Sequence, residues 1–377
     1  MTIILYDNHQ RDQLYPLNSC RANAELRCGI WSVEERWKLF VGDENICIQT
    51  TPLLQQLYPA SESGYCIWVD AALQCSLEVM EQIIALKPGE IMLHDDQIVA
   101  SSIHPLIPTN ANLNIKKNQL KGNCTVIQKP WHVFQYNDAW IREDMNMLSK
   151  FLGSAYIKDG NTIMAKNAVI KNSIINDETG PVFIGENALI MEGCTIRGPF
   201  AIGENAVLKM GTKIYGPVSL GKQAVAGGEI KNAVIQSYSN KAHDGYLGDS
   251  VIGQWCNLGA GTTNSNVKND GGIVELWNPL QKMYEPVSQK CGMIMGDYCR
   301  TAIQTTINTG TLIDMGCSVV DRNLIRKYMP PFVQGGTINH RKIPFDKLML
   351  AIKNWKAMKH QVFTTQEENV LRNLYSR

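Results

Sequence analysis

The sequence predicts an α/β domain, then a left-handed parallel β-helix of hexapeptide repeats, then a short helical tail. Three observations support this prediction. Apolar residues recur at every sixth position in the middle of the chain. Short apolar runs alternate with amphipathic segments before that region, and a helical pattern follows it. The expected boundaries are 1–150 for the α/β domain, 151–335 for the β-helix and 336–377 for the tail.

The strongest signal is the period of six. It consists of seven aliphatic residues, Ile184, Ile190, Ile196, Ile202, Leu208, Ile214 and Leu220. Neither the helical period nor the two-residue alternation of a strand produces this spacing. A hexapeptide solenoid does, because each short strand turns one aliphatic side chain inward and three strands close one coil. A β-sandwich would instead show alternation and more widely separated strands.

The period weakens near Ala226 and returns at Ile252 and from Met295 to Val319. The segment 269–292 interrupts it. That segment holds two strand-like runs around Asn278-Pro279, which predicts a hairpin that projects from the coil.

The first 150 residues lack the period of six. Strands are expected at 3–6, 45–49 and 65–69, alternating with helices within 22–40 and 77–86. Strands that alternate with helices favour an α/β unit with a parallel sheet. Ser32 and Glu35 have the spacing of a capping box at the start of the first helix.

Helices are expected on both sides of the solenoid. One covers 138–151 and leads into the repeats, and another covers 345–360. Thr365 and Glu368 offer a second capping box before a last helix. Because the end of a solenoid exposes unpaired strand edges, we expect the C-terminal helices to cover them or to pack on a neighbouring subunit.

Charge and cysteine content narrow the possible functions. The chain has 36 Lys and Arg against 35 Asp and Glu, a net charge of +1, which argues against partners such as nucleic acid or a membrane surface. Its eleven cysteines are scattered and lack zinc-site spacing, so we expect free thiols in a reducing cytoplasm. The N-terminus lacks the features of a signal peptide, and no apolar stretch is long enough to span a bilayer.

The segment 231–266 is the part of the solenoid richest in reactive groups. It contains His243, and Glu229 and Lys231 lie fourteen and twelve residues before that histidine. Since one coil takes about eighteen residues, groups at these separations can stack on adjacent coils. A histidine that titrates near neutral pH is a natural general base for an amine nucleophile.

The same segment resembles a known family. KAH (241–243), YLGD (246–249), NLGAGT (257–262) and Ser265-Asn266 occur in the order and spacing of its acetyltransferase half. The family is the bifunctional N-acetylglucosamine-1-phosphate uridyltransferase/glucosamine-1-phosphate acetyltransferase. The resemblance is close over about forty residues and looser over the whole solenoid.

The resemblance implies acetyl transfer from acetyl-coenzyme A to an amino sugar phosphate. It implies a homotrimer with its site in the groove between subunits. His243 would be the general base, and Glu229 would orient it. Acceptor contacts would come from Lys231, Tyr246, Asn257 and, in place of an arginine, Lys209, whereas Ala260 and Asn266 would lie on the coenzyme side. Apart from the resemblance, Arg300 in GDYCR (296–300) could meet coenzyme A phosphates or lie on a solvated face.

The match has departures. The family's glycine before the histidine is missing, Asp244 follows the histidine, and Val267 stands where the family has a tyrosine. These changes leave the identity of the acceptor sugar open.

The first domain is similar to sugar nucleotidyltransferases over YPLNSCRANAEL (15–26). It looks like a truncated, nucleotidyltransferase-like domain, because the glycine-rich loop that cradles a triphosphate is missing. Arg21 could contact phosphate and Asp70 could bind Mg²⁺, or both could be structural ion-pair residues. Mg²⁺ would be needed only if this domain is active, and no other metal is expected.

Three functions therefore remain. The first is the acetyltransferase with His243 as its base. The second is a sugar-1-phosphate nucleotidyltransferase whose β-helix serves in trimer assembly. The third is a non-catalytic scaffold that binds a sugar nucleotide, which would have no reason to carry Lys231, His243, Tyr246 and Asn257 together.

Overall fold

The computed structural model describes residues 1–58, 64–104, 115–151, 153–337 and 340–377. The chain forms two compact units. Unit 1 consists of 1–14, 20–26 and 31–128, and unit 2 of 15–19, 27–30 and 129–377. The main division thus falls after Gln128 rather than at residue 150, since the two helices that follow pack on strands of the β-helix.

Unit 1 is built on a six-stranded sheet in the order β2-β1-β3-β6-β5-β7. Its strands are β1 (Thr2–Tyr6), β2 (Ile46–Gln49), β3 (Cys66–Asp70), β5 (Glu90–His94), β6 (Gln97–Ser101) and β7 (Lys116–Gln119). Strand β1 runs parallel to β2 and β3, as expected, but β6 is antiparallel to both β3 and β5. The sheet is therefore mixed, rather than parallel as the sequence pattern predicted. Asp95 and Asp96, with φ of 47° and 62°, form a tight turn that joins only antiparallel strands.

The remaining elements of unit 1 surround this sheet. They are α1 (Val33–Val41), α2 (Leu77–Ile84), the paired strands β4 (Leu73–Cys75) and β8 (Cys124–Val126), and the 3₁₀ helices η1 (Arg11–Leu14), η2 (Asn23–Glu25), η3 (Asp43–Asn45) and η4 (Gln55–Leu57). The predicted capping box is confirmed, because Ser32 Oγ accepts from Glu35 N at 3.2 Å and Glu35 Oε2 accepts from Ser32 N at 2.8 Å. Trp37 of α1 is fully buried.

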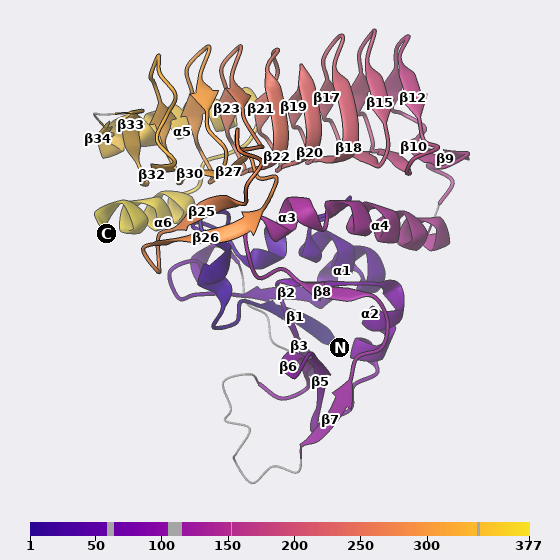
Figure 1. Cartoon of the computed structure of the whole chain (residues 1–377). Coiled ribbons are helices and arrows are strands. Elements are labelled where there is room, and N and C mark those ends of the chain that lie inside the picture. Colours follow the sequence, from indigo (N-terminus) through magenta and orange to yellow (C-terminus); the bar gives the residue numbers. More distant parts are fainter. Residues whose placement is uncertain (59–63, 105–114, 152, 338–339) are drawn as a thin grey trace. The chain divides into compact units, whose positions relative to one another are not determined.

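Unit 2 is a stack of coils whose strands form three faces (Figure 1). Face 1 contains β9 (Tyr156–Asp159), β10 (Thr162–Ala165), β13 (Val182–Ile184), β16 (Phe200–Ile202), β27 (Met293–Met295), β30 (Thr311–Ile313) and β32 (Tyr328–Met329). Face 2 contains β11 (Val169–Ile170), β14 (Leu189–Ile190), β17 (Val207–Leu208), β19 (Val225–Ala226), β21 (Asn240–Lys241), β23 (Asn257–Leu258), β28 (Arg300–Thr301), β31 (Ser318–Val319), β33 (Val333–Gly335) and β34 (His340–Lys342).

Face 3 contains β12 (Ile174–Asn176), β15 (Thr195–Arg197), β24 (Thr263–Asn264) and β29 (Thr306–Ile307). Three longer strands turn the corner from face 3 of one coil to face 1 of the next. They are β18 (Lys213–Leu220), β20 (Glu229–Ile235) and β22 (Tyr246–Ile252). Apart from the pairs β9–β10 and β33–β34, neighbouring strands of these ladders are parallel, so the described part of unit 2 is a parallel β-helix.

The aliphatic residues of the six-residue period fill the interior of the coils, where each is at most 2% exposed. The period weakens where a coil shortens. Val182, Phe200 and Val218 are successive partners eighteen residues apart, but the partner of Val218 in the next coil is Ala233, only fifteen residues on. Asn187 and Asn205 of the repeats adopt φ of 52° and 55°, which asparagine tolerates better than most residues.

Helices flank the coils of unit 2. They are α3 (His132–Gln135), α4 (Asn137–Phe151), α5 (Phe345–Met358) and α6 (Thr365–Ser376). Helix α4 is fixed to β18 by a 2.9 Å hydrogen bond from Ser219 Oγ to Asn137 Oδ1. The capping box of α6 uses Thr364 and Glu367, one residue before the predicted pair.

The expected hairpin is present within 269–292. It consists of the antiparallel strands β25 (Val274–Asn278) and β26 (Met283–Ser288). All eleven cysteines are free thiols. Among the described residues, no helix is long and apolar enough to cross a bilayer.

Candidate functional site

Face 3 carries the densest group of predicted site residues. Lys213, Glu229 and Tyr246 are successive Cα partners on β18, β20 and β22. Each is the first residue of its strand and is followed by an apolar residue that is at most 2% exposed. Because side chains alternate across a strand, the residues on either side of these apolar positions point outward. The three therefore form one outward row.

A second outward row lies beside the first and contains Tyr215 and Lys231. The hydroxyl of Tyr215 donates a hydrogen bond to the carboxylate of Glu229. This bond, together with burial, raises the pKa of Tyr215 to about 12. The ammonium of Lys231 lies 5.9 Å from the centre of the Tyr215 ring. The structure thus gives Glu229 a tyrosine partner that the sequence did not predict.

Tyr246 is held from the next coil. Its hydroxyl accepts a hydrogen bond from Asn266 Nδ2 at 3.1 Å, and the same amide donates to the carboxylate of Asp249. Asn232 Nδ2 donates to Asp249 Oδ1 at 2.6 Å. Burial and the nearby Asp249 charge raise the pKa of Tyr246 to about 12, so the hydroxyl stays protonated at neutral pH. The amide of Asn266, predicted to face the coenzyme, is therefore engaged with Tyr246.

His243 lies in the corner between β21 and β22, and its side chain is exposed. The corner is fixed by Lys241, which is 2% exposed. Lys241 Nζ donates to the carbonyl of Gly227 at 2.9 Å and to that of His243 at 2.5 Å. Burial lowers the pKa of Lys241 to about 8. The backbone of His243 is thus tied to the coil that carries Glu229.

Gly228 allows these two corners to approach closely. Its φ is +79°, and a Cβ there would lie 2.9 Å from the carbonyl oxygen of His243. A larger residue would push apart the coils that carry Glu229 and His243.

A shallow groove of about 510 Å³ runs along face 3. Arg197, Lys213, Tyr215 and Glu229 line it, and the side chains of Arg197 and Lys213 are exposed. Sequence reasoning missed both cations. The signal was available, because each lies next to an inward-facing isoleucine of the six-residue period and must point outward.

Lys209, which was expected in the place of a phosphate-binding arginine, lies elsewhere. It follows β17 directly on face 2, and its carbonyl accepts from Thr212 Oγ1 at 2.5 Å. Lys213, four residues later, occupies the row of Glu229 instead.

Three predicted residues lie on face 2 or at its edge. Asn257 pairs in register with Asn240 and Arg300, and Ala260 follows β23. Asn240 Nδ2 donates to Asn257 Oδ1 at 3.4 Å, and Lys359 Nζ donates to Asn240 Oδ1 at 2.9 Å. Within one chain, Asn257, Ala260 and Arg300 therefore lie on or beside face 2, whereas Glu229 and Tyr246 lie on face 3.

The prediction that Arg300 meets coenzyme phosphates finds no support in its geometry. Its guanidinium lies 4.7 Å from the centre of the Trp355 ring of α5. Arg300 Nη1 donates to the carbonyl of Cys299 at 2.8 Å and also to that of Trp255. Arg300 fastens α5 to the coils.

In unit 1, the predicted nucleotide residues are turned inward. Asp70, at the end of β3, is 2% exposed, and Arg21 is 3% exposed. Asp70 Oδ2 accepts from Asn8 Nδ2 at 2.7 Å, and Oδ1 accepts from Ala72 N at 2.9 Å. Burial raises the pKa of Asp70 to about 7. No group of three His, Cys, Asp or Glu residues that could hold a metal occurs in the described ranges.

Comparison with known proteins gives a family match for the first part of the chain and relatives that align with longer stretches of it. Residues 3–151 match the sugar nucleotidyl transferase family model. The bifunctional sugar-1-phosphate nucleotidylyltransferase/acetyltransferase of Sulfurisphaera tokodaii is 33% identical over 233 residues, which are 60% of this chain and 53% of that protein. The bifunctional protein GlmU of Methanococcus vannielii is 28% identical over 264 residues, 66% of this chain and 53% of that protein.

A shorter relative aligns with most of its own length. The uncharacterized acetyltransferase YaiX of Escherichia coli is 34% identical over 196 residues, which are 51% of this chain and 84% of that protein. By contrast, the chain spans about half the length of the bifunctional relatives.

Proposed function

Because this chain belongs to the GlmU-like family of sugar nucleotidyltransferase/acetyltransferase proteins, we propose that unit 2 transfers an acetyl group from acetyl-coenzyme A to an amino sugar phosphate. The observation that carries the proposal is the outward row of Lys213, Glu229 and Tyr246 beside the anchored corner of His243. This arrangement places the proposed general base, His243, beside a cation, Lys213, and two hydrogen-bonding groups, Glu229 and Tyr246.

In the proposed reaction, the sugar amine attacks the thioester carbonyl carbon of acetyl-coenzyme A. His243 removes the proton that the nitrogen loses as the carbon–nitrogen bond forms. The carbon–sulfur bond then breaks, and the thiolate of coenzyme A takes up one proton. The exposed imidazole of His243 is accessible to a bound amine, and histidine is the side chain that most often serves as a general base.

The cations of face 3 suit the phosphate of the acceptor. Arg197 and Lys213 are exposed in the groove, and Lys231 lies in the adjacent row. Charged donors bind phosphate oxygens more strongly than neutral donors do. Glu229, bonded to Tyr215, would accept from a sugar hydroxyl or from the amine.

A complete site would require more than one copy of the chain. Asn257 and Ala260 lie at face 2, whereas Glu229 and Tyr246 lie on face 3. We therefore include in the proposal a homotrimer of left-handed β-helices, in which face 2 of one copy meets face 3 of the next. The coenzyme would lie in the groove between the copies.

The proposal is tested by the release of free thiol from acetyl-coenzyme A in the presence of three acceptors. These are glucosamine-1-phosphate, unphosphorylated glucosamine and N-acetylglucosamine-1-phosphate. We expect turnover with the first, weak turnover with the second and none with the third, which lacks a free amine. Lys213→Met should raise KM for the phosphorylated acceptor by about tenfold, as loss of a charged contact does.

The matched control is Lys158→Met, because Lys158 is an exposed lysine on face 1. It should leave KM unchanged. Absence of thiol release with every amine acceptor would overturn the proposal.

The family match of residues 3–151 favours a second candidate, sugar-1-phosphate nucleotidyl transfer by unit 1. It would be detected as pyrophosphate release from UTP or dTTP in the presence of a sugar-1-phosphate. The inward-turned Asp70 and Arg21 count against it.

A further inference from the structure

Unit 1 contains a pocket of about 700 Å³. Its lining residues are Tyr6, Asp7, Asn8, His9, Gln10, Gln49, Thr50, Ile91, Asp96, Gln97, Ile98, Ser101, Ile103 and His104. Tyr6 and Gln49 end the parallel strands β1 and β2, so the pocket opens at the carboxyl ends of these strands. Ligands of α/β sheets bind at such ends, and this volume is typical of small-molecule sites.

The charge of the lining argues against a nucleoside triphosphate. Among the described residues, no lysine or arginine lines the pocket, whereas Asp7 and Asp96 do. A triphosphate needs cations or a cluster of backbone N–H groups to balance its charge. The exposed carboxylate of Asp96 would repel it.

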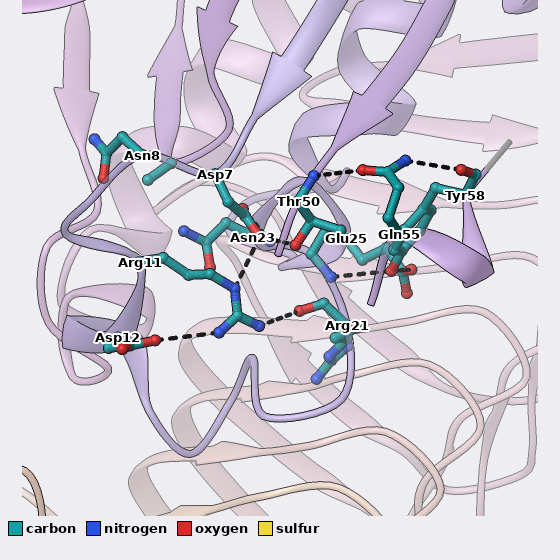
Figure 2. A network of polar contacts seen from close by, with 12 residues as sticks. Asp7, Asn8, Arg11, Asp12, Arg21, Asn23, Glu25, Thr50, Gln55 and Tyr58 are labelled. Carbon is teal, nitrogen blue, oxygen red and sulfur yellow. Dashed lines mark hydrogen bonds and ion pairs between the residues drawn. The ribbon is translucent and has the colours of Figure 1, made fainter. Parts of the chain in front are cut away.

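Arg11, in the loop after β1, is bonded to protein groups, as Figure 2 shows. Arg11 Nε donates to Asp7 at 2.9 Å, Nη1 to Asp12 at 3.3 Å and Nη2 to the carbonyl of Arg21 at 3.0 Å. Asp7 also accepts from Thr50 Oγ1 at 2.5 Å and from Asn23 N at 2.9 Å. The network holds the loop after β1 in place and leaves the Arg11 guanidinium facing protein groups.

The other lining groups suit a ligand that is rich in hydroxyls. Side-chain amides come from Gln10, Gln49 and Gln97, whereas Asn8, Thr50 and Ser101 are bonded to other protein groups. Gln49 Oε1 is buried and has no hydrogen-bond partner in the part of the chain that the structure describes. A buried acceptor without a partner is costly, and rotation of the Gln49 side chain toward the pocket would bring Oε1 to a ligand hydroxyl.

Two rings, those of Tyr6 and His104, also line the pocket. Both pack on Trp68, with ring centres 6.3 Å and 4.4 Å from that of the indole. Burial raises the pKa of Tyr6, so its hydroxyl remains a neutral donor. Apolar rings beside a few fixed polar groups are the usual lining of sites for neutral small molecules.

We propose that this pocket binds a neutral monosaccharide that carries no phosphate, and that Gln49 Oε1 accepts one of its hydroxyl protons. The proposal is independent of acetyl transfer by unit 2. It assigns a ligand to unit 1 that differs from the nucleotide implied by the family match, and it gives the chain separate sites for phosphorylated and unphosphorylated sugars.

Isothermal titration calorimetry of the full chain tests this proposal. The probes are glucose, galactose, mannose, N-acetylglucosamine and UTP with Mg²⁺. We expect at least one monosaccharide to bind, and Gln49→Leu to weaken its Kd at least tenfold. Gln97→Ala, a second change in the lining at an exposed hairpin residue, should weaken it severalfold.

Two controls locate the site. Gln56→Leu removes an exposed amide outside the pocket lining, and Lys213→Met alters the groove of unit 2. Neither should change the Kd of the monosaccharide. Failure of every monosaccharide to bind would overturn the proposal. So would binding that both pocket variants leave unchanged, or UTP binding that Gln49→Leu weakens.

Discussion

The ammonium of Lys241 donates a hydrogen bond to the backbone carbonyl of His243, 2.5 Å away. It donates a second one to the carbonyl of Gly227, 2.9 Å away. A single buried lysine therefore joins the corner that carries the proposed base to the corner that precedes Glu229. This link sets the position of the imidazole relative to the row on face 3.

Lys241→Met should misplace His243 without removing any substrate contact. We expect kcat to fall by about 10- to 100-fold, because small errors in the position of a catalytic group are costly, while KM for both substrates changes less than twofold. Steady-state kinetics with each substrate varied in turn measures this split. Lys222→Met is the control, because Lys222 pairs on the surface with Glu204 at 2.8 Å. A rise in KM with unchanged kcat would contradict a positioning role.

Substitution of Arg300 should lower the melting temperature, whereas substitution of Arg197 should raise KM for the acceptor. Arg300→Met removes the contact with Trp355 and should lower the melting temperature by several degrees without changing KM for acetyl-coenzyme A. Arg197→Met should leave the melting temperature unchanged and raise KM for the phosphorylated acceptor severalfold. Thermal unfolding and initial-rate kinetics on both variants test these expectations. A raised KM for acetyl-coenzyme A in Arg300→Met would restore the role predicted from sequence.

Asn266 supports Tyr246 from the neighbouring coil. Asn266→Ala removes the donor to the Tyr246 hydroxyl and to Asp249, and we expect KM for the acceptor to rise about fivefold. KM for acetyl-coenzyme A should change less. Tyr246→Phe should give a similar rise, and the double variant should add little, since both changes break one contact. Additive effects would show that the residues act separately.

Asp70 and Asp314 should contribute stability that is lost as the pH rises from about 4 to 7. Their pKa values are raised to about 7 by burial, from an ordinary 3.8. In that window these two carboxyl groups keep protons in the folded chain that they release in the unfolded chain, so their contribution to the free energy of unfolding falls with each step upward in pH. Urea unfolding across this range measures the slope. Asp314→Asn should reduce the change in the free energy of unfolding per pH unit by the amount that corresponds to about one proton. An unchanged slope of the free energy against pH would contradict the raised pKa of Asp314.

Sequence reasoning predicted what depends on local pattern. The six-residue period gave the β-helix and the inward positions, and the interruption gave the hairpin. The spacing predicted that Glu229 and Lys231 stack on a coil next to that of His243. Both lie on β20, and His243 lies in the corner before the paired strand β22. These features follow from residues close together in the chain or from one repeated rule.

What the sequence could not predict depends on coil length and on contacts between distant segments. Lys213 rather than Lys209 lies in the row of Glu229, because Lys209 follows a strand of face 2. The burial of Arg300 depends on Trp355, which is far away in the chain. The antiparallel part of the first sheet depends on the turn conformation of Asp95 and Asp96.

The most direct test of the account is the rate of acetyl transfer by His243→Asn, compared with wild type and with His360→Asn. His360 is an exposed histidine with φ of 55°, a conformation that asparagine tolerates. Loss of the base should lower kcat at least about a hundredfold, with KM nearly unchanged, whereas the His360 variant should match wild type. Equal rates in all three proteins would contradict the role of His243.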